Sequence, residues 1–341
     1  MSIFSLVKGE KEHEVFEKGS LNRYTTTNKR GIHMDSTWIN APAKINLGLD
    51  VIRRRDDGYH EVKMIMQSIR LFDRLTLKKT KTPDISLTTN LHFLPVNEDN
   101  LVYESFVNAL AEWGEKTFPV SIDISTEVPV ARGLGSSSTC VVAGIMGAAA
   151  LTGHTVTREE LVAIATAVEG HPDNVAPAIL GAAVCSFTPE GELPRCLRYE
   201  VSKRLRFITI IPPYEVHTSD ARKVVPQEVP LSTAVWQMGR IAGLTRGLEM
   251  GDLDLIAASN DDRLQEPYRR ALIPDYDAIR ETCLTGGAKT LWISGSGSTL
   301  MAVTDDTIVA KFLQVRLRER FPECETHILT CDTDGAQIEY L

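Results

Sequence analysis

A glycine- and serine-rich loop that runs directly into an alanine-rich stretch most constrains the fold of this 341-residue chain. The segment reads PVARGLGSSSTCVVAGIMGAAAL and spans residues 129–151. Gly133 and Gly135 allow backbone torsions that other residues resist, so amide groups can turn inward around an anion. The residues after them contain no early helix breaker, so we expect a helix whose positive N-terminus faces the same anion. The pattern predicts a phosphate site, and two glycines with three serines disfavour the alternative of a helix start without a ligand.

This loop differs from the most familiar nucleotide motifs. Neither GxxxxGK[ST] nor GxGxxG occurs in it, which disfavours a P-loop ATPase and a Rossmann dehydrogenase. A Mg²⁺ ion that bridges nucleotide phosphates could take a serine hydroxyl as a ligand. We expect the nucleotide contacts to come from Pro129, Arg132, Gly133, Leu134, Gly135, Ser136, Ser137 and Ser138.

Charge and composition exclude other classes of protein. The chain carries 37 Lys and Arg against 45 Asp and Glu, a formal net charge of −8, which argues against a nucleic-acid partner. The longest apolar stretch, residues 140–151, is too short to span a bilayer, so no membrane partner is expected. The six cysteines are scattered and lack zinc-ligand spacing, which favours reduced thiols and a cytoplasmic protein.

The pattern of elements predicts an α+β fold with two units that share a cleft. Residues 1–37 are polar and aperiodic and are interpreted as a flexible arm or a tag. We expect a nucleotide-binding domain over 38–195 and a second domain over 196–341. Strands are expected over 39–52, 118–129 and 205–212, with one or two more over 63–79, and helices over 99–113, 158–168, 235–249, 276–285 and 309–321. Asp99 or Asn100 lies near the cap of the first helix, and Thr157 and Glu160 have the spacing of a capping box before the second.

Three motifs resemble those of the GHMP kinases, the family of galactokinase, homoserine kinase, mevalonate kinase and phosphomevalonate kinase. They are APAKINLGLD at 41–50, PVARGLGSSSTCVVAG at 129–144 and WISGSGSTLMAV at 292–303. The resemblance covers nearly everything from Ala41 to the C-terminus. It implies a ribosomal-S5-like N-terminal domain, a ferredoxin-like C-terminal domain, and phosphorylation of a small-molecule alcohol with ATP and Mg²⁺.

Within that family, the segments 169–184, 217–231 and 261–274 resemble the homoserine kinases. This implies conversion of L-homoserine to O-phospho-L-homoserine, a step of threonine biosynthesis. A guanidinium can bind the carboxylate of such a substrate with two hydrogen bonds, and a carboxylate such as Asp50 can accept its ammonium group. The oligomeric state is left open, and a homodimer is compatible with the sequence. The resemblance places around the acceptor Asn46, Asp50, His171, Thr218, Arg222, Arg263 or Arg269, and Gly295.

The N-terminal segment at 41–67 departs from this pattern. APAKINLGLDVIRRRDDGYHEVKMIMQ resembles diphosphocytidyl-methylerythritol kinase, in which Lys44 would approach the reacting hydroxyl and Tyr59 and His60 would contact cytosine. That enzyme usually has more glycines in the phosphate loop and lacks the GHPDN segment. An isoprenoid-type kinase is therefore the alternative function, and a non-catalytic nucleotide-binding member is a further one.

Phosphoryl transfer needs a group that takes the proton of the alcohol. Asp173 is our candidate base, because it follows His171 and Pro172 in a polar turn after a helix. Asn174 could orient the hydroxyl, although an Asx turn or a helix cap is a common role for both residues. Lys44 could lower the pKa of the base or the alcohol and offset charge on the transferring group.

Ser137 and Glu169 are the candidate magnesium ligands. The metal glutamate of the family usually lies further upstream, where this chain has Ala163, with Glu160 one turn earlier. This departure is the reason for considering the non-catalytic alternative.

Overall fold

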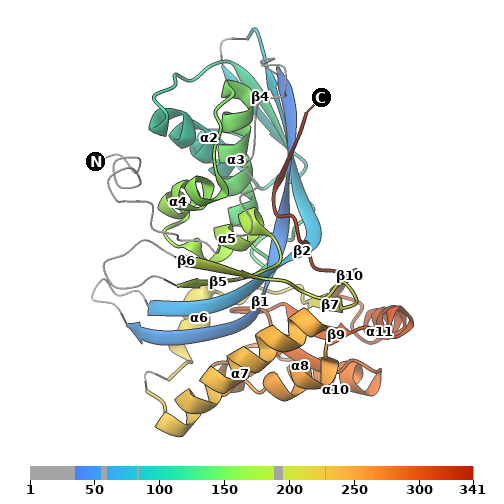
Figure 1. Cartoon of the computed structure of the whole chain (residues 1–341). Coiled ribbons are helices and arrows are strands. Elements are labelled where there is room, and N and C mark those ends of the chain that lie inside the picture. Colours follow the sequence, from blue (N-terminus) through green and yellow to red (C-terminus); the bar gives the residue numbers. More distant parts are fainter. Residues whose placement is uncertain (1–34, 55–59, 83, 188–194, 227, 341) are drawn as a thin grey trace.

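A computed structural model of the chain describes residues 35–54, 60–82, 84–187, 195–226 and 228–340, which form two sheets with helices against them. Figure 1 shows α2, α3, α4 and α5 beside the long, curved hairpin of β1 and β2, and α7, α8, α10 and α11 around the second sheet. The predicted α+β class is confirmed.

The larger sheet has the order β11-β1-β2-β4-β3, and β5 extends it by pairing with β2 and β6. Shifts of register between Pro42 and Ala43 and between Asn46 and Gly48 interrupt the hairpin on either side of Lys44. Such bulges bend a strand and turn its side chains to new directions. The strands are β1 (Ser36–Arg54), β2 (His60–Lys79), β3 (Ile85–Thr89), β4 (Val120–Ser125), β5 (Ala183–Phe187), β6 (Arg195–Tyr199) and β11 (Gln337–Tyr340).

The larger sheet and the helices α2 to α5 form the first unit, and the second sheet with its helices forms the second. The helix α3 (Ser136–Thr152) is central to the first unit and is buried along nearly its whole length. Its small residues allow this, because a Cβ atom on Gly144 would lie 2.7 Å from the carbonyl oxygen of Val102. Around it lie α2 (Leu101–Glu112), α4 (Arg158–Glu169) and α5 (Pro172–Leu180).

Two helix starts that the sequence predicts are confirmed by their caps. The Asn100 side chain accepts a hydrogen bond from the Val102 amide at the start of α2. At the start of α4, Thr157 and Glu160 form a reciprocal capping box. Such caps satisfy amide groups that the first helical turn leaves open.

The second sheet is antiparallel throughout, with the order β10-β7-β9-β8. Its chain order, strand, helices, two strands, helix, strand, is the ferredoxin-like arrangement that the family resemblance implies. The strands are β7 (Arg206–Ile211), β8 (Thr290–Ile293), β9 (Leu300–Thr304) and β10 (Glu325–Leu329), and the helices are α6 (Thr218–Lys223), α7 (Leu231–Met250), α8 (Leu253–Ser259), α9 (Glu266–Arg269), the 3₁₀ turn η1 (Arg270–Leu272), α10 (Tyr276–Thr285) and α11 (Thr307–Arg320).

A hydrophobic cluster joins the two units. Ile45 and Leu47 of β1 belong to the same buried cluster as Phe207 of β7 and Met301 of β9. The predicted domain boundary after residue 195 stays a prediction, and β6 and β11 lie beyond it in sequence while belonging to the larger sheet. The chain after the predicted boundary therefore contributes two strands to the larger sheet, and the two sheets pack on a common hydrophobic cluster.

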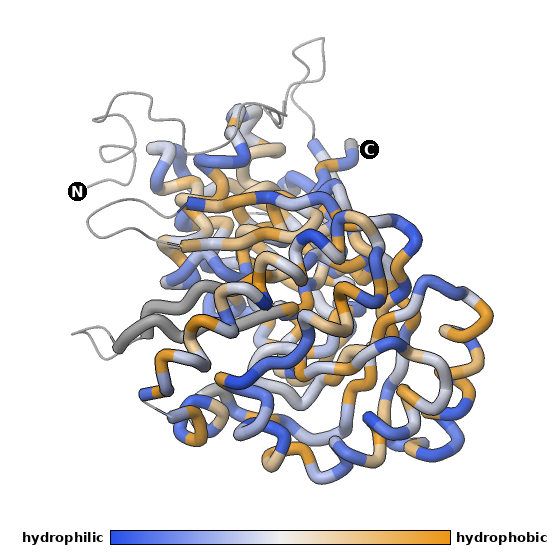
Figure 2. The backbone as a smooth tube through the Cα atoms, turned by 60° about the horizontal axis from the view of Figure 1, so that its bottom comes forward, coloured by the Kyte–Doolittle hydropathy of each residue, from blue (hydrophilic) through white to orange (hydrophobic). Residues whose placement is uncertain are grey.

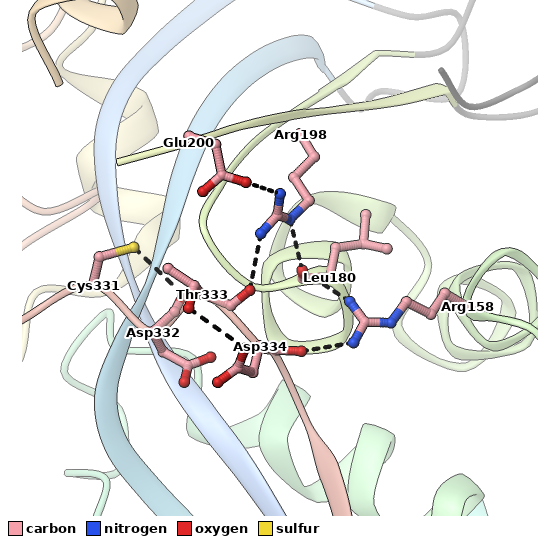
Figure 3. Close-up of polar contacts among 8 residues, drawn as sticks. All are labelled: Arg158, Leu180, Arg198, Glu200, Cys331, Asp332, Thr333 and Asp334. Carbon is pink, nitrogen blue, oxygen red and sulfur yellow. Dashed lines mark hydrogen bonds and ion pairs between the residues drawn. The ribbon is translucent and has the colours of Figure 1, made fainter. Parts of the chain in front are cut away.

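A segment near the C-terminus, residues 333–334, lies against the first unit and shares hydrogen-bond donors with the end of α5. Figure 3 shows Arg158 and Arg198 donating to the Leu180 carbonyl, at 3.2 and 3.1 Å. The same two guanidinium groups donate to the carbonyls of Asp334 at 2.8 Å and Thr333 at 2.9 Å. The end of α5 is thus tied to a segment about 150 residues away in sequence.

The structure corrects one prediction in the polar segment 169–174. We expected a turn, but helix α5 begins at Pro172, with His171 as its N-cap residue. Proline favours the first helical position because its missing N–H would have no partner there and its φ is already helical. Asp173 and Asn174 therefore lie in the first turn of a helix.

None of the described helices is long and apolar enough to cross a bilayer. In Figure 2 the hydrophobic residues concentrate in the inner strands and helices, and hydrophilic residues occupy many of the peripheral turns.

Candidate active site

The phosphate loop (residues 129–138) ends at the N-terminus of α3, which no side chain caps. Its N-cap residue is Gly135, with φ 84°, so a left-handed conformation is required at this position. A Cβ atom there would also lie 2.9 Å from the Cγ atom of Lys44. The first amide groups of a 17-residue helix are left to an external acceptor, which suits a phosphate group.

Contacts from both units hold this loop. The Lys44 amide donates to the Leu134 carbonyl at 2.9 Å, and the Thr299 hydroxyl donates to the Arg132 carbonyl at 2.6 Å. The Arg132 guanidinium forms an ion pair with Glu215 at 2.8 Å. It is therefore directed toward the second unit, although we expected it to contact phosphate.

Asp73 of β2 is a residue of this site that our sequence analysis missed. Its carboxylate is fully buried and accepts hydrogen bonds from the amides of Glu127 and Val128, both at 3.0 Å, and from the Thr139 hydroxyl. Burial raises the pKa of Asp73 to about 6, and the three hydrogen bonds oppose this rise. It ties the segment before the phosphate loop to the first turn of α3. The signal that could have found it is its place in the strand, where Asp73 alternates with the apolar residues Leu71, Leu75 and Leu77 on one face.

Lys44 and Asp173, the two predicted catalytic side chains, are both buried at the phosphate loop. The Lys44 ammonium donates to the Gly133 carbonyl at 2.8 Å. Burial lowers the pKa of Lys44 to about 8, while the charges of Asp173 and Glu169 raise it. Burial raises the pKa of Asp173 to about 6, while His171 and Lys44 lower it. Asn174 lies beside Asp173 in the first turn of α5 and is half-buried.

Glu169, at the end of α4, meets the serines of the loop. Its Oε1 atom accepts hydrogen bonds from Ser137 at 3.0 Å and from Ser138 at 3.2 Å. Glu160 is instead bound to the Thr157 amide in the capping box, at 2.8 Å. No cluster of three or more His, Cys, Asp or Glu with metal-ligand geometry occurs among the described residues. Magnesium often uses one or two carboxylates together with substrate phosphates and water, so the Ser137 and Glu169 pair suits it.

A pocket opens next to Asn46 and Gly295, two of the predicted acceptor residues. The Trp292 indole donates to the Asn46 carbonyl at 3.0 Å, and the Asn46 amide donates to the Ser294 hydroxyl at 3.1 Å. The pocket is lined by Asn46, Leu47, Arg240, Asp262, Gln265, Glu266, Arg269, Trp292, Ile293 and Gly295.

Arg269 is the predicted arginine that reaches this pocket. It is 5% exposed, and it donates to the Gly295 carbonyl at 2.7 Å and to the Ala221 carbonyl at 3.2 Å. Burial lowers the pKa of Arg269 to about 10, so the group is charged at neutral pH. A buried, charged guanidinium is suited to a carboxylate ligand.

Other predicted acceptor residues lie outside the pocket lining, although the charge of Arg222 lowers the pKa of the neighbouring Arg269. Arg263 forms an ion pair with Asp261 at 2.8 Å and stacks on Trp236. Arg222 is exposed on α6. Neither lines the pocket. His171 precedes α5, half-buried. The side chains of Asp50 and Thr218 are outside the described part of the structure, as are Tyr59 and the side chain of His60.

Sequence reasoning also missed Arg240, Asp262 and Glu266 in the pocket lining. Burial raises the pKa of Glu266 to about 7, opposed by a hydrogen bond from the Tyr276 hydroxyl. Arg240 carries no local motif, and only its position on the inner side of α7 reveals it.

Comparison with known proteins agrees with the fold and identifies the family. The family descriptions GHMP kinases N terminal domain and GHMP kinases C terminal match residues 100–182 and 243–323. The homoserine kinase of Synechocystis sp. is 32% identical over 282 residues, which cover 80% of this chain and 92% of that protein. The homoserine kinase of Moorella thermoacetica is 37% identical over 236 residues, which cover 69% of this chain and 79% of that protein.

A solved structure has the same fold. The crystal structure of homoserine kinase from Cytophaga hutchinsonii aligns with a TM-score of 0.78 at 27% sequence identity. The alignment covers 92% of this chain and all of that one. The resemblance inferred from the three motifs is confirmed, and the chain belongs to the GHMP kinase family of ATP-dependent small-molecule kinases.

Proposed function

We propose that this kinase transfers the γ-phosphoryl group of ATP to the hydroxyl of L-homoserine and releases O-phospho-L-homoserine. The observation that carries the proposal is the buried Arg269 guanidinium in a pocket beside the phosphate loop. Such a group favours an acceptor with a carboxylate over a neutral polyol. The relatives in Synechocystis sp. and Moorella thermoacetica are homoserine kinases, which supports the same acceptor.

The nucleotide phosphates would bind at the N-terminus of α3, where no side chain caps the first amide groups, those of Ser136, Ser137 and Ser138. Glu169 and Ser137 would hold Mg²⁺, because their oxygen atoms lie together at the same helix end. When bound, this ion offsets the negative charge of the phosphate groups.

Asp173 would accept the proton of the substrate hydroxyl. Its pKa of about 6 leaves it mostly ionised at neutral pH and therefore able to take a proton. The alcohol oxygen then forms a bond to the γ-phosphorus, and the bond to the bridging oxygen of ADP breaks. Lys44, whose ammonium is fixed on the Gly133 carbonyl, would balance charge on the transferring group.

The isoprenoid-type alternative depends on Tyr59 and His60, whose side chains are outside the described part of the structure. The non-catalytic alternative depends on the missing upstream glutamate. Glu169 at the loop serines supplies a carboxylate in its place, which supports a catalytic kinase.

A panel of acceptors tests the proposal. Purified protein with MgATP is incubated separately with L-homoserine, diphosphocytidyl-methylerythritol and mevalonate, and ADP release and the phosphorylated product are measured. We expect the highest kcat/KM with L-homoserine, and phosphohomoserine identified by phosphorus NMR. Faster turnover of another acceptor, with no phosphohomoserine, would contradict the proposal.

A further inference from the structure

Arg240 lies in the middle of α7 and lines the acceptor pocket beside Arg269. The residue is 5% exposed. Its Nε and Nη1 atoms have no hydrogen-bond partner among the described residues. It is therefore a buried guanidinium of which two nitrogen atoms, Nε and Nη1, donate to no described residue.

Among the described residues, neither carboxylate of the pocket accepts a hydrogen bond from Nε or Nη1 of this group, although the charge of Arg240 lowers the pKa of Glu266. Asp262 Oδ1 accepts hydrogen bonds from the Leu264 amide at 2.7 Å and the Gln265 amide at 3.1 Å. Glu266 accepts the Tyr276 hydroxyl. Within the described residues, Arg240 has no ion-pair partner within 4.0 Å.

A buried guanidinium is strongly unfavourable unless an anion and hydrogen bonds compensate for its lost hydration. Arginine does not lose its proton under ordinary conditions, so it cannot escape this cost by titrating. The cost is recovered if an anionic ligand occupies the pocket. The phosphates of the nucleotide belong at the N-terminus of α3, which leaves the anionic group of the acceptor for this position.

We propose that Arg240 is a specificity-determining residue that binds the α-carboxylate of the acceptor together with Arg269. This inference rests on the proposed function and deepens it. Two guanidinium groups and two carboxylates, those of Asp262 and Glu266, line one pocket, and together they match an α-amino-acid zwitterion. Arg263 is bound to Asp261, and Arg222 is exposed, so neither offers a comparable buried donor.

Two competitive inhibitors separate this role from a structural one. L-2-Aminobutyrate keeps the carboxylate and ammonium groups of L-homoserine and lacks its hydroxyl, whereas 3-amino-1-propanol lacks the carboxylate. In Arg240→Met we expect KM for L-homoserine and Ki for L-2-aminobutyrate to rise at least about tenfold. Ki for 3-amino-1-propanol and KM for ATP should stay within about twofold.

Further variants complete the design. Arg240→Lys should restore part of the affinity, because it keeps the charge and loses the paired donors. Arg246→Met, on the same helix, is the matched control and should leave all four constants unchanged, because its exposed guanidinium is bound to Glu249 outside the pocket. The melting temperature of Arg240→Met should equal or exceed that of the wild type, since a buried guanidinium with two unpaired nitrogen atoms is removed.

Several outcomes would overturn the inference. Arg240 would instead support the structure if Ki rose equally for both inhibitors, if the melting temperature of Arg240→Met fell, or if this variant failed to fold. Unchanged constants would show that the carboxylate binds elsewhere while the proposed function stands. Absence of phosphohomoserine with the wild-type chain would overturn the proposed function, and this inference with it.

Discussion

Burial moves the pKa values of Lys44 and Asp173 toward each other. It lowers the pKa of Lys44 to about 8 and raises that of Asp173 to about 6, because the charged form of each group loses hydration. Each group also favours the charged form of the other. Between these two values both groups are charged, as the proposed roles require.

We therefore expect a bell-shaped dependence of kcat on pH. The rate should fall about tenfold per pH unit below about 6, where Asp173 takes up a proton, and above about 8, where Lys44 loses one. Asp173→Asn should lower kcat at least about 100-fold and change KM for ATP by less than about threefold. Steady-state kinetics over pH 5 to about 10 measure both effects. A kcat for Asp173→Asn close to the wild-type value would remove Asp173 from the mechanism.

We expect Asp73 to affect the free energy of unfolding more directly than the catalytic step. Its pKa of about 6 in the folded protein lies above the ordinary value of 3.8, so the folded state binds more protons between these values. Its contribution to the free energy of unfolding therefore falls as pH rises from about 4 to about 6. In Asp73→Asn the amide oxygen can still accept from Glu127 and Val128, and the charge is gone. We expect this variant to be at least as stable as the wild type at pH 7, with the difference shrinking toward pH 4.

Asp73→Ala is the contrasting variant. It leaves the buried amides of Glu127 and Val128 without their partner, which should cost about 2 to 3 kcal/mol at pH 7. Urea unfolding at pH 4 and 7 measures both variants. Equal destabilisation by Asn and Ala would show that the ionised carboxylate itself is required.

At the scale of elements, the start of α3 depends on the conformation of one residue. Gly135→Ala introduces a Cβ atom at φ 84° and 2.9 Å from the Lys44 side chain. We expect kcat/KM for ATP to fall at least about tenfold, because the helix N-terminus and the Lys44 ammonium are both displaced. Gly239→Ala on α7 is the matched control, since a Cβ atom there would meet nothing within 4 Å. That control should keep wild-type kinetics and gain up to about 1 kcal/mol of stability.

At the scale of the whole molecule, the C-terminus stabilises the helix that carries Asp173. The Asp332 carbonyl accepts from the Ala182 amide at 2.7 Å, and the Ala336 amide donates to the Ala178 carbonyl at 2.7 Å. With the two arginines of Figure 3, these contacts surround the end of α5. The position of Asp173 thus depends on residues far from it in sequence.

Two truncations distinguish the contribution of strand β11 from that of the segment that contacts the end of α5. Deletion of residues 337–341 removes β11 from the edge of the sheet and should lower the free energy of unfolding by about 2 to 4 kcal/mol, with kcat preserved. Deletion of residues 332–341 also removes the partners of α5 and should lower kcat at least about tenfold. Thermal unfolding and steady-state kinetics compare the two. Wild-type kcat after the longer deletion would show that α5 keeps its position without the C-terminal segment.

The sequence by itself determined those features that depend on local chemistry. The left-handed glycines of the phosphate loop, Gly133 and Gly135, and the capping box of Thr157 and Glu160 were predicted from neighbouring residues alone. Periodicity placed most helices within a few residues, but it missed the start of α5 at Pro172, where proline begins the helix. Only the tertiary structure decided which distant groups share an environment. Asp73 and Arg240 were identified only because the structure shows that both are buried, Asp73 with three hydrogen-bond donors around it and Arg240 with two unpaired nitrogen atoms. The free energy of a buried charge depends on all the groups around it, and most of these are distant in sequence.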